Sequence, residues 1–254
     1  MELPLLKRKI LITREAKQSK GFADKLTNLG AEVSTVPLLK INCKNSRDNQ
    51  HMLQKIMNFQ WIVFTSENGI NCFFQLLEDD TLLQQIRFAV VGKKTEEALN
   101  RYGYQADLVP SIYDGNHLVT EFLDRYHEIG KVLLVQGNRS RDVIEKGLIN
   151  AGVPYETLIV YETSYNEEAR KSLDRVLRAV EFDFITFTSP STVEAFHQFK
   201  PSELHLPIDT NIICIGKTTE NRAKELGFNQ TRIPDSYTID GMIEVMCQTF
   251  NRED

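Results

Sequence analysis

The 254-residue sequence lacks the motifs of several large enzyme classes. It has no GxGxxG dinucleotide motif, no Walker loop, no GxSxG nucleophile elbow and no HExxH zinc motif. Its five histidines are dispersed along the chain, so no metal site is expected. These absences argue against a P-loop enzyme, a serine hydrolase of the common fold and a zinc protease.

Cysteine and long apolar runs are also scarce. The four cysteines are Cys43, Cys72, Cys214 and Cys247, and they form neither a CxxC pair nor a Cys/His pattern. We therefore expect reduced, structural thiols. No apolar stretch approaches the length of a membrane span, and basic residues interrupt the start of the chain at 7–9. A cytoplasmic protein is expected.

Positive charge is not in excess, because 30 basic residues face 35 acidic ones and the net charge is −5. Non-specific binding of nucleic acid needs a basic surface, so this class of partner is not expected. A small anionic ligand is still compatible with this balance, since helix N-termini can bind anions locally.

The sequence contains two copies of one module. Thr65-Ser66 follows the apolar run 61–64, and Thr188-Ser189 follows the run 184–187, at an offset of 123 residues. Gly92 and Gly216 each precede a lysine and a threonine-glutamate pair, at an offset of 124. The same offset separates three further pairs: Gly103 and Gly227, Pro110 and Pro234, Tyr113 and Tyr237. Solenoid repeats are much shorter, so the chain is a duplicated domain.

Apolar strands alternate with amphipathic helices throughout, which is typical of parallel sheets covered on both faces. The expected strands are 9–14, 31–39, 61–64, 88–91, 106–109, 131–135, 155–161, 183–187, 211–215 and 228–233. The expected helices include 51–58, 67–77, 141–150, 167–180, 191–198, 219–226 and 238–250. We predict an α/β protein of two similar flavodoxin-like, doubly wound domains, joined by a two-stranded linker and separated by a cleft.

Hydroxyl side chains stand where strands give way to helices. Ser66 and Ser189 are expected at one such junction in each copy, and Thr95 and Thr219 at a second. Serine and threonine are ordinary helix caps, which is the simpler interpretation. Four junctions at the carboxyl ends of parallel strands would also suit carboxylates or phosphates. Arginines at strand ends could bind an anion or could be ordinary surface residues. Tyr161 could donate a proton or could simply pack at the end of its strand.

Six segments together resemble the uroporphyrinogen-III synthase family. They are Ile-Leu-Ile-Thr-Arg (10–14), Val-Phe-Thr-Ser-Glu-Asn-Gly-Ile (63–70), Val-Val-Gly-Lys-Lys-Thr (90–95), Val-Tyr-Glu-Thr (160–163), Phe-Thr-Ser-Pro-Ser-Thr (187–192) and Cys-Ile-Gly-Lys-Thr-Thr (214–219). The resemblance extends from about residue 9 to residue 246.

This resemblance implies a cyclising lyase of tetrapyrrole biosynthesis. Its substrate would be hydroxymethylbilane, a linear tetrapyrrole that the enzyme dehydrates and closes, with inversion of ring D through a spiro intermediate. No cofactor and no metal are implied. The family architecture implies one discontinuous domain, 1–38 with 163–254, and an inserted domain, 39–162.

The resemblance also implies the site residues. Tyr161 matches the family's tyrosine, which would protonate the leaving hydroxyl. The residues implied to bind substrate are Arg14, Thr65, Ser66, Asn68, Thr95, Gly137, Arg141, Ser189, Ser191, Thr218 and Thr219. One departure is Gln136-Gly137, where the family often has Arg-Gly, so an anion contact is lost or taken over by Arg139.

For partners, the resemblance implies the tetrapyrrole substrate, a transient contact with hydroxymethylbilane synthase, no nucleic acid, no membrane, and a monomer. Two other classes fit duplicated α/β modules: a sensor that binds a small anion without turnover, and a nucleotide-sugar transferase. Turnover of hydroxymethylbilane would distinguish the synthase from the sensor and from the transferase.

Overall fold

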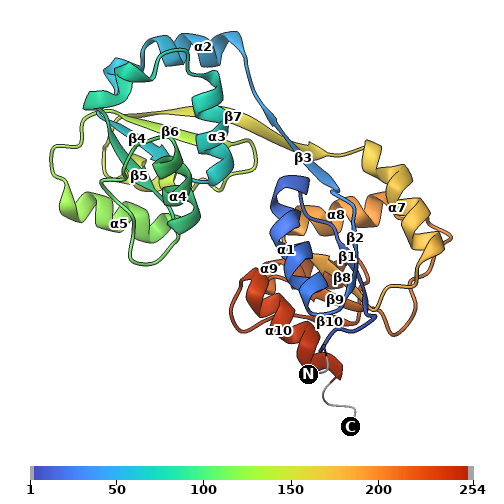
Figure 1. Cartoon of the computed structure of the whole chain (residues 1–254). Coiled ribbons are helices and arrows are strands. Elements are labelled where there is room, and N and C mark those ends of the chain that lie inside the picture. Colours follow the sequence, from blue (N-terminus) through green and yellow to red (C-terminus); the bar gives the residue numbers. More distant parts are fainter. Residues whose placement is uncertain (1–2, 251–254) are drawn as a thin grey trace. The chain divides into compact units, whose positions relative to one another are not determined.

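The computed structural model describes residues 3–250 of the chain (Figure 1). Its strands are β1 (Lys9–Ile12), β2 (Glu32–Thr35), β3 (Leu39–Cys43), β4 (Trp61–Phe64), β5 (Arg87–Val90), β6 (Val132–Gly137), β7 (Tyr155–Tyr165), β8 (Phe184–Phe187), β9 (Asn211–Cys214) and β10 (Thr231–Arg232). Its α-helices are α1 (Ala16–Asn28), α2 (Arg47–Gln54), α3 (Glu67–Leu76), α4 (Lys93–Arg101), α5 (Gly115–Arg125), α6 (Val143–Asn150), α7 (Glu168–Ala179), α8 (Pro190–Phe199), α9 (Lys217–Glu225) and α10 (Ile239–Phe250).

Contacts divide the chain into two compact units. Unit 1 combines residues up to Lys40 with those from Ser164 onward, and unit 2 is Ile41–Thr163. The family resemblance implies boundaries at 38/39 and 162/163, one or two residues earlier. The chain passes from one unit to the other within β3 and again within β7 (Figure 1).

Both units have the strand order of a flavodoxin-like sheet. Unit 1 has the order β10-β9-β8-β1-β2, and its four neighbouring strand pairs are all parallel. Unit 2 has the order β3-β7-β6-β4-β5, so β3 occupies the edge that β10 occupies in unit 1. The connections change direction between β1 and β8 in unit 1, and between β4 and β6 in unit 2. These are the topological switch points, where such sheets bind ligands.

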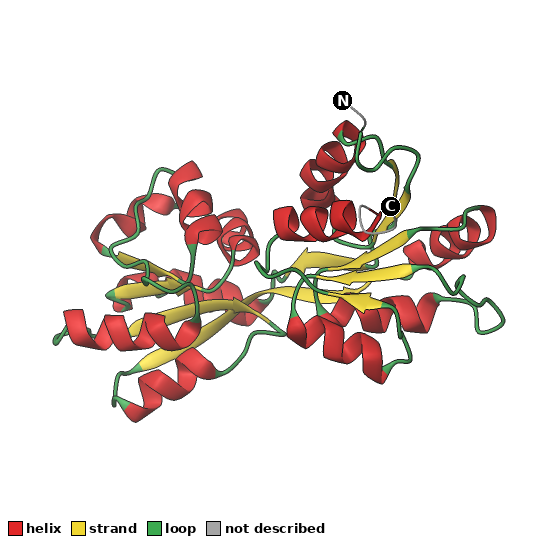
Figure 2. Cartoon of the chain, turned by 90° about the horizontal axis from the view of Figure 1, so that it is seen from below, coloured by secondary structure: helices red, strands yellow, loops and turns green. Residues whose placement is uncertain are grey.

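Each sheet is buried on both faces by its own helices (Figure 2). In unit 2, Phe64 and Val135 pack in a cluster that includes residues of α3, whereas Trp61 and Leu134 pack on the other face with α5 and α6. Unit 1 likewise has one apolar cluster on each side of its sheet. The prediction of two doubly wound α/β units is confirmed, because near-continuous apolar strands need two covered faces.

Several predicted elements differ from the structure in extent. The strand expected at 31–39 ends at Thr35, and β3 is a separate strand of the other sheet. The strand expected at 155–161 continues to Tyr165, and the one expected at 228–233 is reduced to Thr231–Arg232. The strand expected at 106–109 is reduced to a single bridge between Ala89 and Leu108. The carboxylate of Asp107 there accepts the amide hydrogen of Phe88, in place of a ladder hydrogen bond. The helix expected at 51–58 starts earlier, because the side chain of Ser46 caps α2.

The prediction that all four cysteines are reduced thiols is wrong for one pair. Cys43 and Cys72 form a disulfide, while Cys214 and Cys247 are free. The two bonded residues lie 29 positions apart in sequence, and only the packing of α3 beside β3 brings them together. Sequence spacing alone cannot predict such a pair.

Candidate active site

Tyr161 and Ser66 meet in unit 2. The Tyr161 hydroxyl lies 3.0 Å from the Ser66 hydroxyl, and the tyrosine is only 9% exposed. Ser66 caps α3, and its oxygen accepts the amide hydrogen of Gly69 at 3.1 Å. Because the hydrogen bond from the Gly69 amide holds the serine oxygen in place as an acceptor, the serine hydroxyl hydrogen can be donated to the tyrosine oxygen. A phenol held in this way can release its proton while the serine stabilises the phenolate.

Gly137 makes room for the tyrosine ring. The pairing of β6 with β7 shifts register between Gln136 and Gly137, which places Gly137 opposite Tyr161. A Cβ atom at Gly137 would lie 2.3 Å from Cζ and 2.7 Å from the hydroxyl oxygen of Tyr161. The backbone amide of Asn138 also donates to the carbonyl oxygen of Tyr161 at 3.1 Å. The register shift and the missing side chain together set the position of the phenol.

Two buried polar atoms without a partner among the described residues lie at the ends of β4 and β6. They are Oγ1 of Thr65 and Oε1 of Gln136. The Gln136 amide is oriented by Glu145, whose carboxylate accepts from Gln136 Nε2 at 2.8 Å and from Thr157 at 3.0 Å. Gln136 thus presents its oxygen as an acceptor. The family resemblance singles out Gln136 as a departure, but its hydrogen bond to Glu145 is seen only in the structure.

The other predicted residues of unit 2 are spread around this switch point. Asn68 lies half-buried in the first turn of α3. Thr95 is buried within α4, which begins after Gly92, so the prediction that Thr95 starts a helix is wrong. Arg141 is exposed and precedes α6, which begins at Val143 and not at 141 as predicted. Among these residues, only Thr65, Ser66, Gly137 and Tyr161 belong to the cluster described above.

Unit 1 holds the remaining predicted residues at the carboxyl ends of β1, β8 and β9. Arg14 follows β1, and Ser189 caps α8 in a reciprocal pair of hydrogen bonds with Thr192. Pro190 occupies the first turn of that helix, as the sequence predicts. The set is completed by three residues: Ser191 in α8, and Thr218 and Thr219 in α9. Helix α9 begins after Gly216, so Thr219 does not start it, contrary to the prediction.

Glu220, in the first turn of α9, is a buried acidic residue that the sequence does not single out. It is 5% exposed, and Lys217, Lys224 and Thr231 all donate to its carboxylate. The hydrogen bond from Lys217 is the largest cause that lowers the pKa of Glu220, to about 2. The ionised carboxylate in turn holds Lys217 at the N-terminus of α9, where a lysine adds positive charge to the first amide groups.

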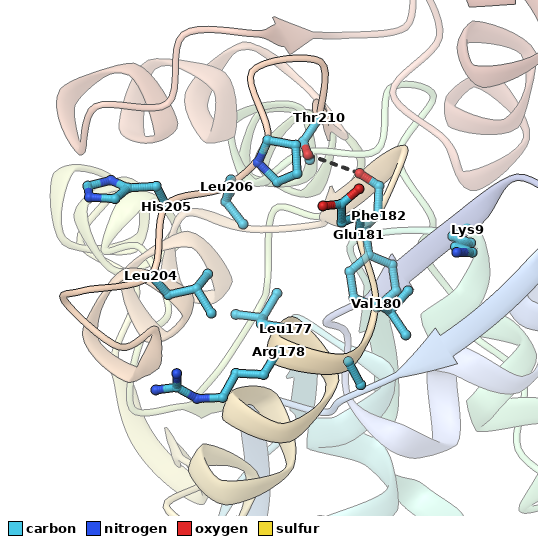
Figure 3. A pocket seen from close by; sticks show the side chains of 12 residues that line it. Lys9, Leu177, Arg178, Val180, Glu181, Phe182, Leu204, His205, Leu206 and Thr210 are labelled. Atoms are coloured by element: carbon cyan, nitrogen blue, oxygen red, sulfur yellow. Dashed lines mark hydrogen bonds between the residues drawn. The ribbon is translucent and has the colours of Figure 1, made fainter.

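One hollow of unit 1 lies away from these residues. A cavity of about 450 Å³ is bordered by Lys9, Phe182 and Thr210, which precede or begin β1, β8 and β9 (Figure 3). It is therefore at the amino ends of the strands, whereas the predicted residues follow the carboxyl ends. Within residues 3–250, no cluster of three metal-ligating side chains is found. None of the helices in this range has the length and hydropathy of a membrane span.

The fold and these side chains define a class of protein. Both switch points carry helix starts and hydroxyl groups, which are suited to bind carboxylates, and one also carries a buried phenol suited to proton transfer. These features are those of a two-unit α/β protein whose helix starts are suited to an anionic ligand.

Comparison with known proteins narrows the class. The family described as uroporphyrinogen-III synthase HemD matches residues 20–244. The porphyrin biosynthesis protein HemD of Ruminiclostridium josui is 31% identical over 98% of this chain, which spans about half of that protein's length. The uroporphyrinogen-III synthase of Synechococcus elongatus is 28% identical, with 95% of each chain covered. The chain belongs to the uroporphyrinogen-III synthase family.

Solved structures agree at the level of the fold. The uroporphyrinogen-III synthetase of Helicobacter pylori superimposes with a TM-score of 0.69 at 16% identity, covering 95% of this chain and 99% of that one. Family membership makes this chain a cyclising lyase of porphyrin biosynthesis that acts on a tetrapyrrole.

Proposed function

We propose that the chain converts hydroxymethylbilane to uroporphyrinogen III, and that Tyr161 is the proton donor. The observation that carries the proposal is the 3.0 Å contact between the Tyr161 and Ser66 hydroxyls above Gly137, at the switch point of unit 2. In the reaction, the bond between the terminal hydroxymethyl carbon and its oxygen breaks, assisted by electron donation from the nitrogen of the attached pyrrole. The phenol proton of Tyr161 goes to the departing oxygen, which leaves as water.

Ser66 takes part through its hydrogen-bond capacity. Its oxygen is occupied as an acceptor by the Gly69 amide, so its own hydrogen can turn to the phenolate that forms on Tyr161. A donor aimed at developing charge stabilises a transition state more than a ground state. Ser66 therefore lowers the barrier to proton release and also fixes the start of α3.

Closure in the correct sense depends on positioning. The substrate carries an acetate and a propionate on each ring, and helix starts bind carboxylates through their amide groups. Thr65, Asn68 and Thr95 in unit 2 would hold some of these carboxylates. The candidates of unit 1 would hold others: Arg14, Ser189, Ser191, Thr218 and Thr219. Gly137 leaves space for the ring of Tyr161, and Arg141 is exposed and available for an ionic contact.

A coupled assay tests the activity. Hydroxymethylbilane is generated in situ, the protein is added, and the oxidised uroporphyrin isomers are separated by chromatography. Mostly isomer III is the expected result. Only isomer I, as forms without enzyme, would contradict the proposal and favour the anion-binding sensor. The expected cytoplasmic location, monomeric state and transient contact with the preceding synthase stay predictions.

A further inference from the structure

The disulfide of unit 2 joins α3, which begins after Ser66, to β3, the neighbour in the sheet of the strand β7 that carries Tyr161. Cys43 is the last residue of β3, and Cys72 lies in α3, with their Cα atoms 5.2 Å apart. Cys72 is 3% exposed, whereas Cys43 is half-buried. Cys43 is thus the more accessible residue of the pair.

On the β3 side, the bond is anchored next to Tyr161. Strand β3 neighbours β7 in the sheet, and the amide of Lys44, directly after Cys43, donates to the carbonyl oxygen of Val160 at 2.7 Å. The Lys44 ammonium also pairs with Glu162 at 2.8 Å. Cys43 is therefore fixed to the segment of β7 that carries the tyrosine.

On the α3 side, the bond is anchored to the helix that begins at Ser66. Cys72 follows Ser66 by six residues, which is less than two helical turns. Ile70 and Phe73 are fully buried and pack α3 into the apolar cluster on this face of the sheet. The disulfide therefore adds a constraint on where the helix start lies relative to β7, while the fold itself rests on the apolar core.

We propose that Cys43–Cys72 is a redox-responsive modification site that positions the Tyr161–Ser66 pair, with a dithiol as its reactant. This inference rests on the proposed function of Tyr161. One thiolate of the dithiol attacks the Cys43 sulfur and expels the Cys72 thiolate, which takes up a proton. The second thiol of the reagent then displaces Cys43. The reagent is oxidised to a disulfide, and the protein gains two electrons and two protons as two thiols.

Thiol counting tests the bond without reference to activity. The protein is treated with oxidised glutathione, desalted, denatured, alkylated with iodoacetamide and weighed intact. Two labels are expected, on Cys214 and Cys247, and four after treatment with dithiothreitol. Four labels after glutathione treatment would overturn the proposal, because the pair then does not form a bond.

Kinetics test the positioning. Reduced protein should have a turnover number lower by about threefold or more, with KM within about twofold, since a small displacement of a reacting group costs rate more than binding. The Cys43→Ser/Cys72→Ser double variant should have this lower turnover number with and without dithiothreitol. Cys247→Ser, a matched control outside the pair, should respond to dithiothreitol as the wild type does.

The outcomes separate this inference from the proposed function. Equal turnover numbers for the oxidised and reduced wild type, with the bond verified by thiol count, would overturn the positioning role. If the double variant fails to fold, the reduced wild type gives the same comparison, with circular dichroism to verify its fold. Absence of isomer III in both redox states would instead refute the proposed function, and the thiol count would still decide whether the bond exists.

Discussion

Gly137 is the residue on which the position of the Tyr161 ring depends. An added Cβ would overlap Cζ and Cε2 of the ring, at 2.3 and 2.4 Å. Gly137→Ala should therefore push the phenol away from Ser66 and lower the turnover number by about 10- to 100-fold. Steady-state kinetics in the coupled isomer assay would measure this effect.

Gly147 offers a matched control in the same unit. A Cβ there would lie 2.5 Å from Val119 Cγ1, which is a clash of similar size between α5 and α6 and away from Tyr161. Gly147→Ala should lower the free energy of unfolding by about 1–3 kcal/mol and leave the turnover number of the folded fraction unchanged. Equal losses of turnover in the two variants would mean that Gly137 acts only through stability.

At this scale the sequence singles out candidate site residues but does not predict their contacts. Ser66 and Tyr161 are both singled out, as a helix start and as a strand-end tyrosine. Their hydrogen bond depends on a register shift at Gln136–Gly137, and such a shift leaves no mark in hydrophobic periodicity. The orientation of Gln136 by Glu145 is hidden for the same reason, because it depends on how α6 packs on the sheet.

Helices α3 and α8 are equivalent elements of the two units, and both begin with a capping serine. Ser66 accepts from Gly69, and Ser189 accepts from Thr192. Replacing either serine by alanine should cost about 1 kcal/mol of unfolding free energy, measured by urea denaturation. Ser66→Ala should also lower the turnover number, because Ser66 contacts Tyr161, whereas Ser189→Ala, at a proposed carboxylate contact, should act mainly by raising KM. A larger loss of turnover in Ser189→Ala would contradict this assignment.

Glu220 makes the stability of α9 dependent on pH. Its folded pKa of about 2 is below the ordinary value of 4.5, chiefly through the hydrogen bond from Lys217. The ionised carboxylate therefore stabilises the fold above the unfolded pKa, and this contribution is lost as pH falls from 4.5 towards 2. Glu220→Gln should lower the free energy of unfolding at pH 7 by about 1–2 kcal/mol and weaken its decline below pH 5.

Urea unfolding at successive pH values would measure this dependence. Glu96→Gln is the control at the matching position of α4, where Glu96 forms no ion pair within residues 3–250. That variant should follow the wild-type curve. An identical acid decline in Glu220→Gln and the wild type would show that other carboxyl groups dominate.

The starts of α4 and α9 show where element prediction fails. Thr95 and Thr219 precede glutamates in a pattern that favours a helix start, yet both helices begin after a glycine three residues earlier. The amides of Thr95 and Thr219 already bond to the carbonyl oxygens of Gly92 and Gly216, so these threonines lie inside the first turn. Local composition cannot tell whether a helix begins at the glycine or at the threonine three residues later, because both residue types suit the start of a helix.

For the whole molecule, the alternation of strands and helices is enough to predict two doubly wound units. That alternation predicts parallel sheets with two covered faces, but it does not fix the strand order, which the structure supplies. What alternation cannot predict is that β3, the first strand of the inserted segment, completes the far edge of the unit 2 sheet. The family resemblance supplies the discontinuous division that local patterns lack.

The central claim is that Tyr161 donates the proton during turnover by the whole chain. The turnover number of the Tyr161→Phe variant tests this claim most directly. The substitution removes one oxygen atom and leaves the ring over Gly137, so packing and substrate binding should be preserved. We predict a turnover number for isomer III lower by at least about tenfold, with KM changed by less than about twofold. An unchanged turnover number would contradict the assignment of Tyr161 as proton donor.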